Sequence, residues 1–242
     1  MKWLVISLTA YLVVCAAGGA YVVGQALRRP RQQLTAADRA QAEALARTLG
    51  AKLETVSIEA GDGVTLRGWL FSASPPKVPS ILLAHGIASN RAGMLAVARL
   101  FVERGYRTLV VDLRGAGESG GYGTFGALET DDLHRWIAWM RRGDRSGVCV
   151  YELGISLGAA LVLGAAGAPG LCGVVAQSPF ASLREIGFDR IGQQLHIGSW
   201  AGRSVLRPGL EFAFLYARFR YGVDLSTHRP WHRWRVRAPR FS

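Results

Sequence analysis

The chain has 242 residues, half of them hydrophobic, which suffices for the core of one large domain or two small ones. Outside the C-terminal tail no long basic stripe with interleaved aromatic side chains occurs, so the net charge of +12 does not indicate a nucleic-acid partner. Five arginines crowd into the last fourteen residues: Arg229, Arg233, Arg235, Arg237 and Arg240.

Residues 3–27 carry no charge. As a helix this segment would extend about 37 Å, enough to cross a bilayer. We predict an uncleaved membrane anchor within residues 1–30. A secretory signal peptide is the alternative, because the small residues at 16–20 follow the apolar core and could form a cleavage site.

The charges that flank this segment bear on its orientation. Lys2 precedes it, whereas Arg28, Arg29 and Arg31 follow it. This asymmetry favours a cytoplasmic position for the rest of the chain. The sequence thus predicts a single-pass membrane protein or, if the segment is removed, a secreted or periplasmic one.

The next segments predict a linker and a hairpin. Residues 31–50 form a polar, alanine-rich helical stretch, which we expect to link the anchor to one α/β domain over residues 51–242. Residues 55–58 and 64–71 predict a β-hairpin, because the intervening Gly61-Asp62-Gly63 tolerates positive φ.

Beyond the hairpin, short apolar runs alternate with helical segments. The continuous run at 81–84 is typical of a strand buried on both faces of a parallel sheet. The repeated β-α unit predicts a doubly wound, mostly parallel α/β sheet with an antiparallel hairpin at its start. Further strands are predicted at 108–112, 148–153 and 173–177, and helices at 91–104, 128–142 and 157–166.

The stretch Gly154-Ile155-Ser156-Leu157-Gly158 joins a predicted strand to a predicted helix. This is the context of a G-x-S-x-G nucleophile elbow, in which glycines allow the sharp turn that exposes the serine oxygen. Ser156 is therefore the candidate nucleophile. The bare pattern also fits a plain strand-to-helix turn, since 30 of the 242 residues are glycine.

Neither a metal nor an organic cofactor is predicted. The three cysteines, Cys15, Cys149 and Cys172, lack the spacing of a metal site. We expect buried free thiols rather than a disulfide, because Cys15 lies in an apolar segment and the other two flank predicted strands. The glycine-rich residues 115–123 lack the Lys-Ser/Thr ending of a phosphate-binding loop.

Three turns that each follow a predicted strand together resemble the α/β-hydrolase superfamily, in its BEM46-like or serine-aminopeptidase-like branch. They are His85-Gly86-Ile87, the glycine-rich loop at 112–120 and the elbow at Ser156, and the stretch at 177–182 is similar too. The resemblance covers about residues 55–225. It implies an α/β-hydrolase fold and a serine hydrolase that acts on an ester, amide or thioester through an acyl-Ser156 intermediate.

The resemblance also assigns roles to neighbouring groups. The backbone N–H groups of Ile87 and Leu157 would form the oxyanion hole. His85 would be structural, and the loop at 112–120 architectural, with Arg114 tying its backbone together. The expected substrate is a small-molecule or lipid-like acyl compound, because the anchor and the aromatic-rich, cap-like segment at 185–219 suit an apolar acyl group.

A serine hydrolase of this kind also needs an acid and then a histidine after the nucleophile. By resemblance, the strand that leads to the acid would follow Pro239. Asp224 and His232 are in the right order but lie eight residues apart, too few for the intervening strand and helix. We therefore expect the C-terminal strands and both triad partners to be missing, through truncation or a frameshift near residue 230.

A chain without these strands would leave the strand at 173–177 as a sheet edge. The alternative to an active enzyme is then a catalytically dead hydrolase-like protein or a membrane-tethered interaction module. A basic surface-binding module that uses the arginine tail ranks third.

Overall fold

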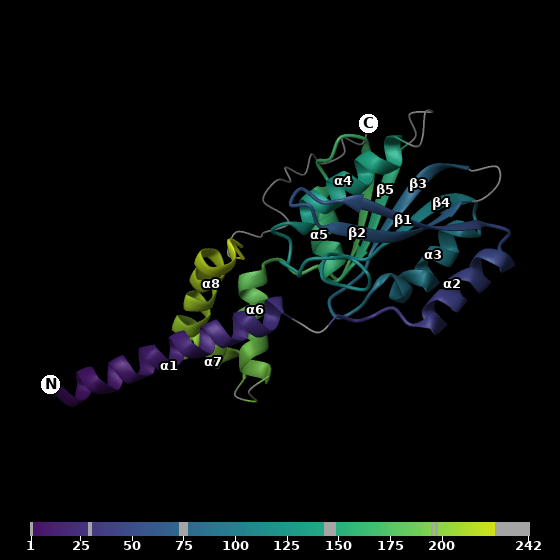
Figure 1. Ribbon diagram of the computed structural model, residues 1–242. Coiled ribbons are helices and arrows are strands. Elements are labelled where there is room, and N and C mark those ends of the chain that lie inside the picture. The colour runs from purple at the N-terminus through teal and green to yellow at the C-terminus, as the bar shows by residue number, and fades with distance from the viewer. Residues whose placement is uncertain are drawn as a thin grey trace, which may run out of the picture.

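The computed structural model describes residues 2–28, 31–72, 77–142, 149–194, 196 and 198–225. A sheet domain makes up most of it, and a smaller group of helices lies beside that domain (Figure 1). Six strands in this part of the chain form one sheet in the order β1-β2-β4-β3-β5-β6. Their bounds are β1 Lys52–Glu59, β2 Thr65–Ser72, β3 Lys77–Ala84, β4 Tyr106–Val111, β5 Val150–Ile155 and β6 Leu171–Gln177.

The sheet is mixed, as predicted. Strand β2 is antiparallel to both of its neighbours, β1 and β4, whereas β4, β3, β5 and β6 run parallel. The predicted α/β class and the antiparallel hairpin at the start are therefore confirmed. Among the described residues, β6 pairs only with β5 and lies at the sheet edge, where Val175 is 58% exposed.

Helices cover both faces of the sheet. Helices α2 Ala36–Thr48 and α3 Leu95–Val102 pack on one face, and α4 Glu129–Arg142 and α5 Leu157–Ala165 on the other (Figure 1). The helix expected at 91–104 begins with a 3₁₀ turn, η1 Arg91–Met94. Helix α2 begins with a reciprocal capping box between Thr35 and Asp38, and it buries Ala42 and Ala46 in the core of the domain.

The remaining helices form a cap beside the sheet domain. They are α6 Leu183–Gln194, α7 Ser199–Arg203, α8 Arg207–Tyr221 and the C-terminal half of α1 Lys2–Leu27. Helix α1 runs parallel to α8, since Tyr11 donates to the carbonyl of Val205 and Gly24 lies near the Tyr221 hydroxyl.

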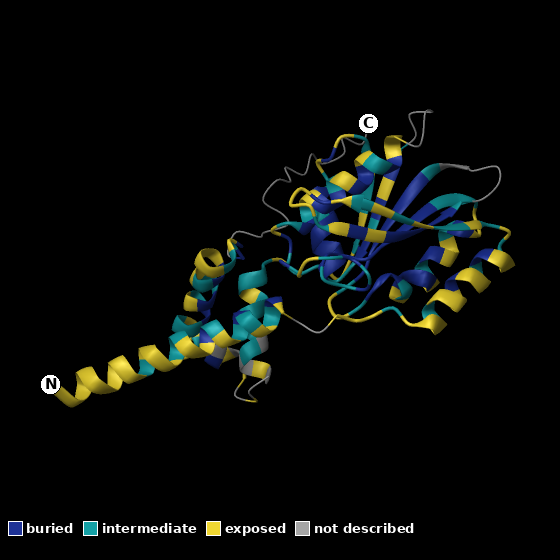
Figure 2. Ribbon diagram, viewed as in Figure 1, coloured by how far each residue is buried: buried dark blue, intermediate teal, exposed yellow. Residues whose placement is uncertain are grey.

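The two helices meet without room for a side chain. A Cβ on Gly19 would lie 2.3 Å from the carbonyl oxygen of Gly209. Val23 and Leu27, further along α1, are buried in a cluster with Ala213 and Ala217 of α8. Residues 2–10 of α1 project beyond the cap and are exposed (Figure 2).

Within the described ranges, α1 is the one helix long and apolar enough to cross a membrane. A signal sequence near the N-terminus meets the same criteria, so this property alone does not separate the two interpretations.

The prediction of free thiols at Cys149 and Cys172 is wrong. The two residues form a disulfide that joins the starts of β5 and β6, with their Cα atoms 5.4 Å apart. The register shifts at this point, because Val150 pairs with Leu171 while Tyr151 pairs with Gly173. Cys172 is thus an extra residue in the edge strand, and the shift brings its sulfur within reach of Cys149. Cys15 is free.

Removing this disulfide is expected to lower the free energy of unfolding by about 2 kcal/mol, because the bond restricts the unfolded chain. The value lies at the lower end of the usual range because the bond joins strands that already pair. Urea denaturation of a Cys149→Ser/Cys172→Ser variant would measure it, with Cys15→Ser as the matched control. Equal unfolding midpoints for oxidised and reduced wild-type protein would contradict the expectation.

Candidate active site

Ser156 occupies the turn between β5 and α5 in a strained conformation. Its φ is +55° and its ψ −111°, a region that residues with a side chain rarely adopt. The turn is held by hydrogen bonds from the Ser156 N–H to the Gln177 carbonyl at 2.9 Å and from the Ala160 N–H to the Ser156 carbonyl at 3.1 Å. A sharp strand-to-helix turn of this kind is what the predicted nucleophile elbow requires.

Neither glycine of the motif has room for a side chain. A Cβ at Gly154 would lie 2.2 Å from the carbonyl oxygen of Gly158. One at Gly158 would lie 2.2 Å from the carbonyl oxygen of Ala84, at the end of β3. The start of α5 therefore packs directly onto two strand ends, which only glycine allows.

The two predicted oxyanion donors flank Ser156. The turn after β3 lies against the serine, since a Cβ on Gly86 would be 3.3 Å from the Ser156 Cβ and 4.0 Å from its Oγ. Ile87 follows directly in that turn. Leu157 is the first residue of α5, so its N–H has no acceptor within the helix. Free N–H groups at this position suit a developing negative charge.

His85 has both ring nitrogens occupied. Its Nε2 accepts the N–H of Leu113 at 3.1 Å, and its Nδ1 donates to the carbonyl of Gly86 at 2.7 Å. Burial lowers the pKa of the imidazole, which keeps the ring neutral as these bonds require. The side chain thus ties the turn after β3 to the loop after β4, and it has no free nitrogen to act as a base.

The loop at 112–120 is organised by a buried carboxylate. Asp112 accepts the N–H groups of Arg91 and Glu118 at 2.7 and 2.8 Å and pairs with the Arg91 guanidinium at 2.7 Å. Ser119 Oγ donates to the Asp112 carbonyl at 2.7 Å. A Cβ at Gly117 would overlap the Asp112 carboxylate. Asp112, rather than Arg114, therefore holds the backbone of this loop together through hydrogen bonds.

The expected role of Arg114 is therefore corrected. Its guanidinium binds Asp132 at 2.7 and 2.8 Å and Asp62 at 2.9 Å, so it fastens the loop to α4 and to the hairpin turn. Burial would lower the pKa of Arg114, but the bonds to the two carboxylates outweigh burial and raise the pKa. The hydrogen bond from Arg114 lowers the pKa of Asp62.

A pocket of about 350 Å³ opens beside these turns. Leu157 and the residues of the turn after β3 form one side. The end of α1 and the chain that follows it form another. That chain is tied in place, because the Gln32 carbonyl accepts the Asn90 side chain and the Gly117 N–H, each at 3.2 Å.

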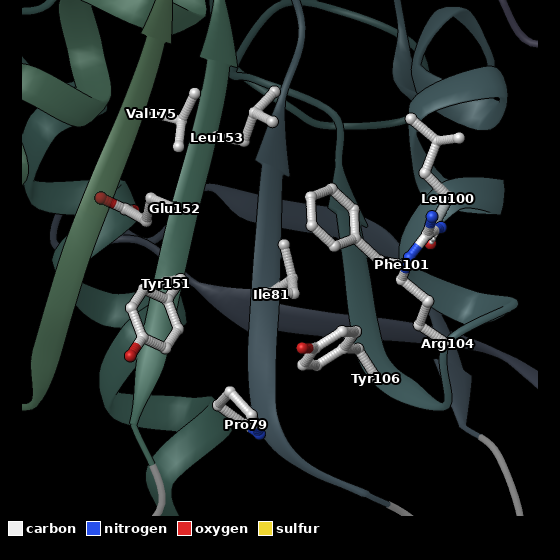
Figure 3. Close-up of a pocket in the computed structure, with 10 residues that line it drawn as sticks. All are labelled: Pro79, Ile81, Leu100, Phe101, Arg104, Tyr106, Tyr151, Glu152, Leu153 and Val175. Carbon is white, nitrogen blue, oxygen red and sulfur yellow. Dashed lines mark hydrogen bonds between the residues drawn. The ribbon is translucent and has the colours of Figure 1, made fainter.

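A second hollow, of about 500 Å³, lies on the sheet face that carries α3. Figure 3 shows apolar and aromatic side chains around it, among them Phe101, Tyr106 and Tyr151. The carboxylate of Glu152 points away from Phe101 and Tyr106 in that view, because neighbouring residues of a strand face opposite sides of the sheet. The described residues that line this hollow include no serine, cysteine or histidine.

The structure records no triad partner for Ser156 within the described ranges. Of the carboxylates and histidines that follow it, Asp224 lies near Arg218, with 3.8 Å between their charged atoms, and His196 is in the cap. His228, His232 and the arginine tail lie outside the described residues. In the same ranges, no group of three His, Cys, Asp or Glu side chains could hold a metal ion.

Comparison with known proteins identifies the family. The sequence profile of the X-Pro dipeptidyl-peptidase (S15) family matches residues 24–206, more than half of the chain. The chain belongs to this family. The S15 match begins in the last turn of α1 and ends just before α8, so it includes the sheet, the elbow and the first cap helices.

The chain is also similar to curated proteins over part of its length. The chain is 28% identical to the YqkD protein of Bacillus subtilis over 173 residues, 69% of this chain and 54% of that protein. It is 32% identical to the polyketide transferase ATR5 of Stachybotrys chlorohalonatus over 118 residues, 47% of this chain and 39% of that protein. The chain spans about half the length of the first curated relatives it matches.

The solved structures show the same fold. The esterase Pf2001 of Pyrococcus furiosus superposes with a TM-score of 0.60 at 24% identity, over 76% of this chain and 68% of the esterase. The α/β-hydrolase resemblance inferred from the three turns is therefore confirmed as to fold and superfamily.

Two features of the site were not predicted. The end of α1 forms a wall of the pocket, although the sequence marked it only as the edge of an anchor. The buried pair of Arg91 and Asp112 behind the pocket was also missed. A charged residue at the end of the strand predicted at 108–112, three residues before Gly115, would have been the signal for Asp112.

Proposed function

We propose that the protein is a serine hydrolase that transfers the acyl group of an ester, amide or thioester to Ser156 and then to water. Ser156 Oγ would attack the carbonyl carbon, and the leaving group would depart with the proton that the serine hydroxyl loses. The N–H groups of Ile87 and Leu157 would stabilise the tetrahedral oxyanion, and water would then release the acid.

The observation that carries this proposal is the strained elbow. Ser156 has a φ of +55° at the strand-to-helix turn. Gly86 brings the turn after β3 against Ser156, and Gly158 lets the start of α5 pack on the end of β3. Membership of the S15 family and the likeness to polyketide transferase ATR5 agree with acyl transfer.

A catalytically inactive hydrolase-like protein is the second candidate. It is favoured by His85, whose two nitrogens are both engaged, and by the lack of a recorded base next to Ser156 in the described part of the chain. In this case the elbow would persist as a fold element only.

A fluorophosphonate probe separates the two. The wild-type protein is expected to be labelled, and Ser156→Ala to lose labelling and at least about 10³-fold in ester turnover. Ser182→Ala, a serine at the start of the cap, is the matched control and should keep both. A folded wild-type protein that takes no label would support the inactive candidate. Residual turnover has to be judged against Ser156→Ala, because an oxyanion hole alone retains some catalysis.

We also propose that α1 is retained as a membrane anchor. Tyr11 donates to the Val205 carbonyl and Cys15 lies against Gly209, so cleavage after the small residues at 16–20 would remove these contacts to α8 and the chain before it. The free N-terminal half is apolar all round, as a lipid-embedded helix is. Sodium carbonate extraction of membranes would test this: protein released into the soluble fraction would contradict it.

The disulfide supports a location outside the cytoplasm for the sheet domain, because such bonds persist in oxidising compartments. This argues against the orientation that the flanking arginines favour. A membrane-impermeant thiol reagent applied to intact cells after mild reduction should therefore modify Cys172, which is exposed.

A further inference from the structure

The pocket beside Ser156 is built for a molecule with an apolar part. Much of its lining is aliphatic or aromatic and comes from α1, from the two loops after β3 and β4, and from α5. Ligand sites of this kind bind through apolar walls, and a few placed polar groups fix orientation. The apolar lining includes Ala26, Leu27, Ile87, Leu113, Phe125 and Leu157.

Two of the charged groups in the lining are satisfied by the protein itself. Arg114 is bound by the carboxylates of Asp62 and Asp132. Glu129 accepts the N–H groups of Thr124 and Gly126 and the Thr124 hydroxyl. Because both charged groups already have partners within the protein, neither needs a charged group of a ligand to compensate it.

Arg28 and Arg31 are different. Within the described residues neither has a carboxylate at ion-pair distance. Arg31 donates one bond to the Gly121 carbonyl at 3.0 Å, which holds the guanidinium at the rim and leaves its other donors free. Both line the pocket just beyond α1, near Gln32, whose carbonyl accepts the Asn90 side chain and the Gly117 N–H. The part of the pocket lined by Arg28 and Arg31 is therefore positively charged, and no described carboxylate pairs with these two arginines.

From these contacts we propose that the pocket selects acyl substrates that carry an anionic group, a carboxylate or a phosphate, which Arg28 and Arg31 bind while the apolar part fills the pocket. This rests on the proposed function of Ser156. Guanidinium groups suit both anions because their N–H donors match the spacing of two oxygens.

The same charge disfavours the substrate that the family description names. A dipeptidyl-peptidase must accept a peptide N-terminus close to the scissile bond, and an α-amino group is largely protonated at neutral pH. Two uncompensated guanidinium groups repel that ammonium, and among the lining residues the carboxylate that could offset them, Glu129, is already engaged. We therefore expect this chain to prefer substrates with an anionic group over substrates with a cationic N-terminus.

The test uses two esters of equal chain length. 4-Nitrophenyl hydrogen glutarate carries a terminal carboxylate, and 4-nitrophenyl pentanoate carries a methyl group in its place. The wild-type protein should favour the anionic ester in kcat/KM by about tenfold, a modest factor because both arginines are exposed and screened. Arg28→Gln/Arg31→Gln should lower the anionic value about tenfold and leave the neutral value within about twofold.

Arg104→Gln is the control for loss of an arginine elsewhere, since it removes one positive charge at the second hollow and should leave the ratio unchanged. A wild-type ratio near one, or a ratio that the double variant keeps, overturns the proposal. The proposed function fails separately, if Ser156→Ala turns over both esters at the wild-type rate or wild-type protein turns over neither.

Binding provides a readout without turnover. Dodecyl phosphate, titrated below its micelle concentration into Ser156→Ala protein, should bind about tenfold more weakly once Arg28 and Arg31 are replaced. A parallel arm measures sedimentation with phosphatidylglycerol and phosphatidylcholine vesicles. If the double variant loses only phosphatidylglycerol vesicles while dodecyl phosphate and the ester ratio are unaffected, the arginines bind a membrane surface and the proposal is overturned.

Discussion

Gly158→Ala is expected to abolish the native fold, with a loss of at least about 4 kcal/mol in the free energy of unfolding. The new Cβ would lie 2.2 Å from the Ala84 carbonyl oxygen and 2.7 Å from that of His85. Both are backbone atoms at the end of β3, a central strand, so neither can rotate away. The sheet and α5 would have to separate, which would expose the core beneath them.

Circular dichroism and urea denaturation would measure this effect. Gly167→Ala is the matched control, because a Cβ there has open space and the residue lies just after α5. It should change the free energy of unfolding by less than about 1 kcal/mol. A Gly158→Ala protein with wild-type stability would show that α5 does not pack on the strand ends.

Glu152→Gln is expected to stabilise the protein by about 3 kcal/mol at pH 7. The Glu152 carboxyl is 1% exposed and has no hydrogen-bond partner in the described part of the chain. Its strand neighbours across the sheet are Leu82 and Val174. Burial in these apolar surroundings raises the pKa of Glu152 to about 8, well above its ordinary 4.5.

The sign of the pH dependence follows from this shift. Between pH 4.5 and 8 the folded protein binds one proton more than the unfolded chain, so the free energy of unfolding falls as pH rises. The contribution is complete below pH 4.5 and largely lost by pH 8, at about 1.4 kcal/mol for each pH unit.

Urea denaturation from pH 5 to pH 8 would show this slope in wild-type protein and its loss in Glu152→Gln. Glu43→Gln, an exposed carboxylate on α2, should keep the wild-type slope. An unchanged slope in Glu152→Gln would mean that the carboxyl is solvated or paired in the native protein.

Most of the fold could be predicted from local sequence patterns. The hairpin was predictable because Gly61-Asp62-Gly63 marks its turn, and the elbow because two glycines surround Ser156 at a strand-to-helix junction. Each depends on neighbours within a few residues, where steric rules for the backbone apply directly.

The disulfide could not be predicted in the same way. Cys149 and Cys172 lie 23 residues apart on strands that are adjacent only in the folded sheet. Their pairing depends on the register of β5 against β6 and on the one-residue shift at Cys172, which no pattern along a single strand reports. The wall formed by the end of α1 is likewise a tertiary contact, set by Gly19 against Gly209.

The way α1 lies against the cap has a practical side for anyone preparing the protein. An apolar N-terminal helix is commonly deleted to obtain soluble material, and removing the first 27 residues here would strip the partners of Ala213 and Ala217 from α8. It would also open one side of the pocket next to Leu157. If such a shortened protein were inactive, the cause would be the damaged pocket, and the result would not test whether Ser156 is a nucleophile. Detergent-solubilised full-length chain is the form in which assays can be interpreted.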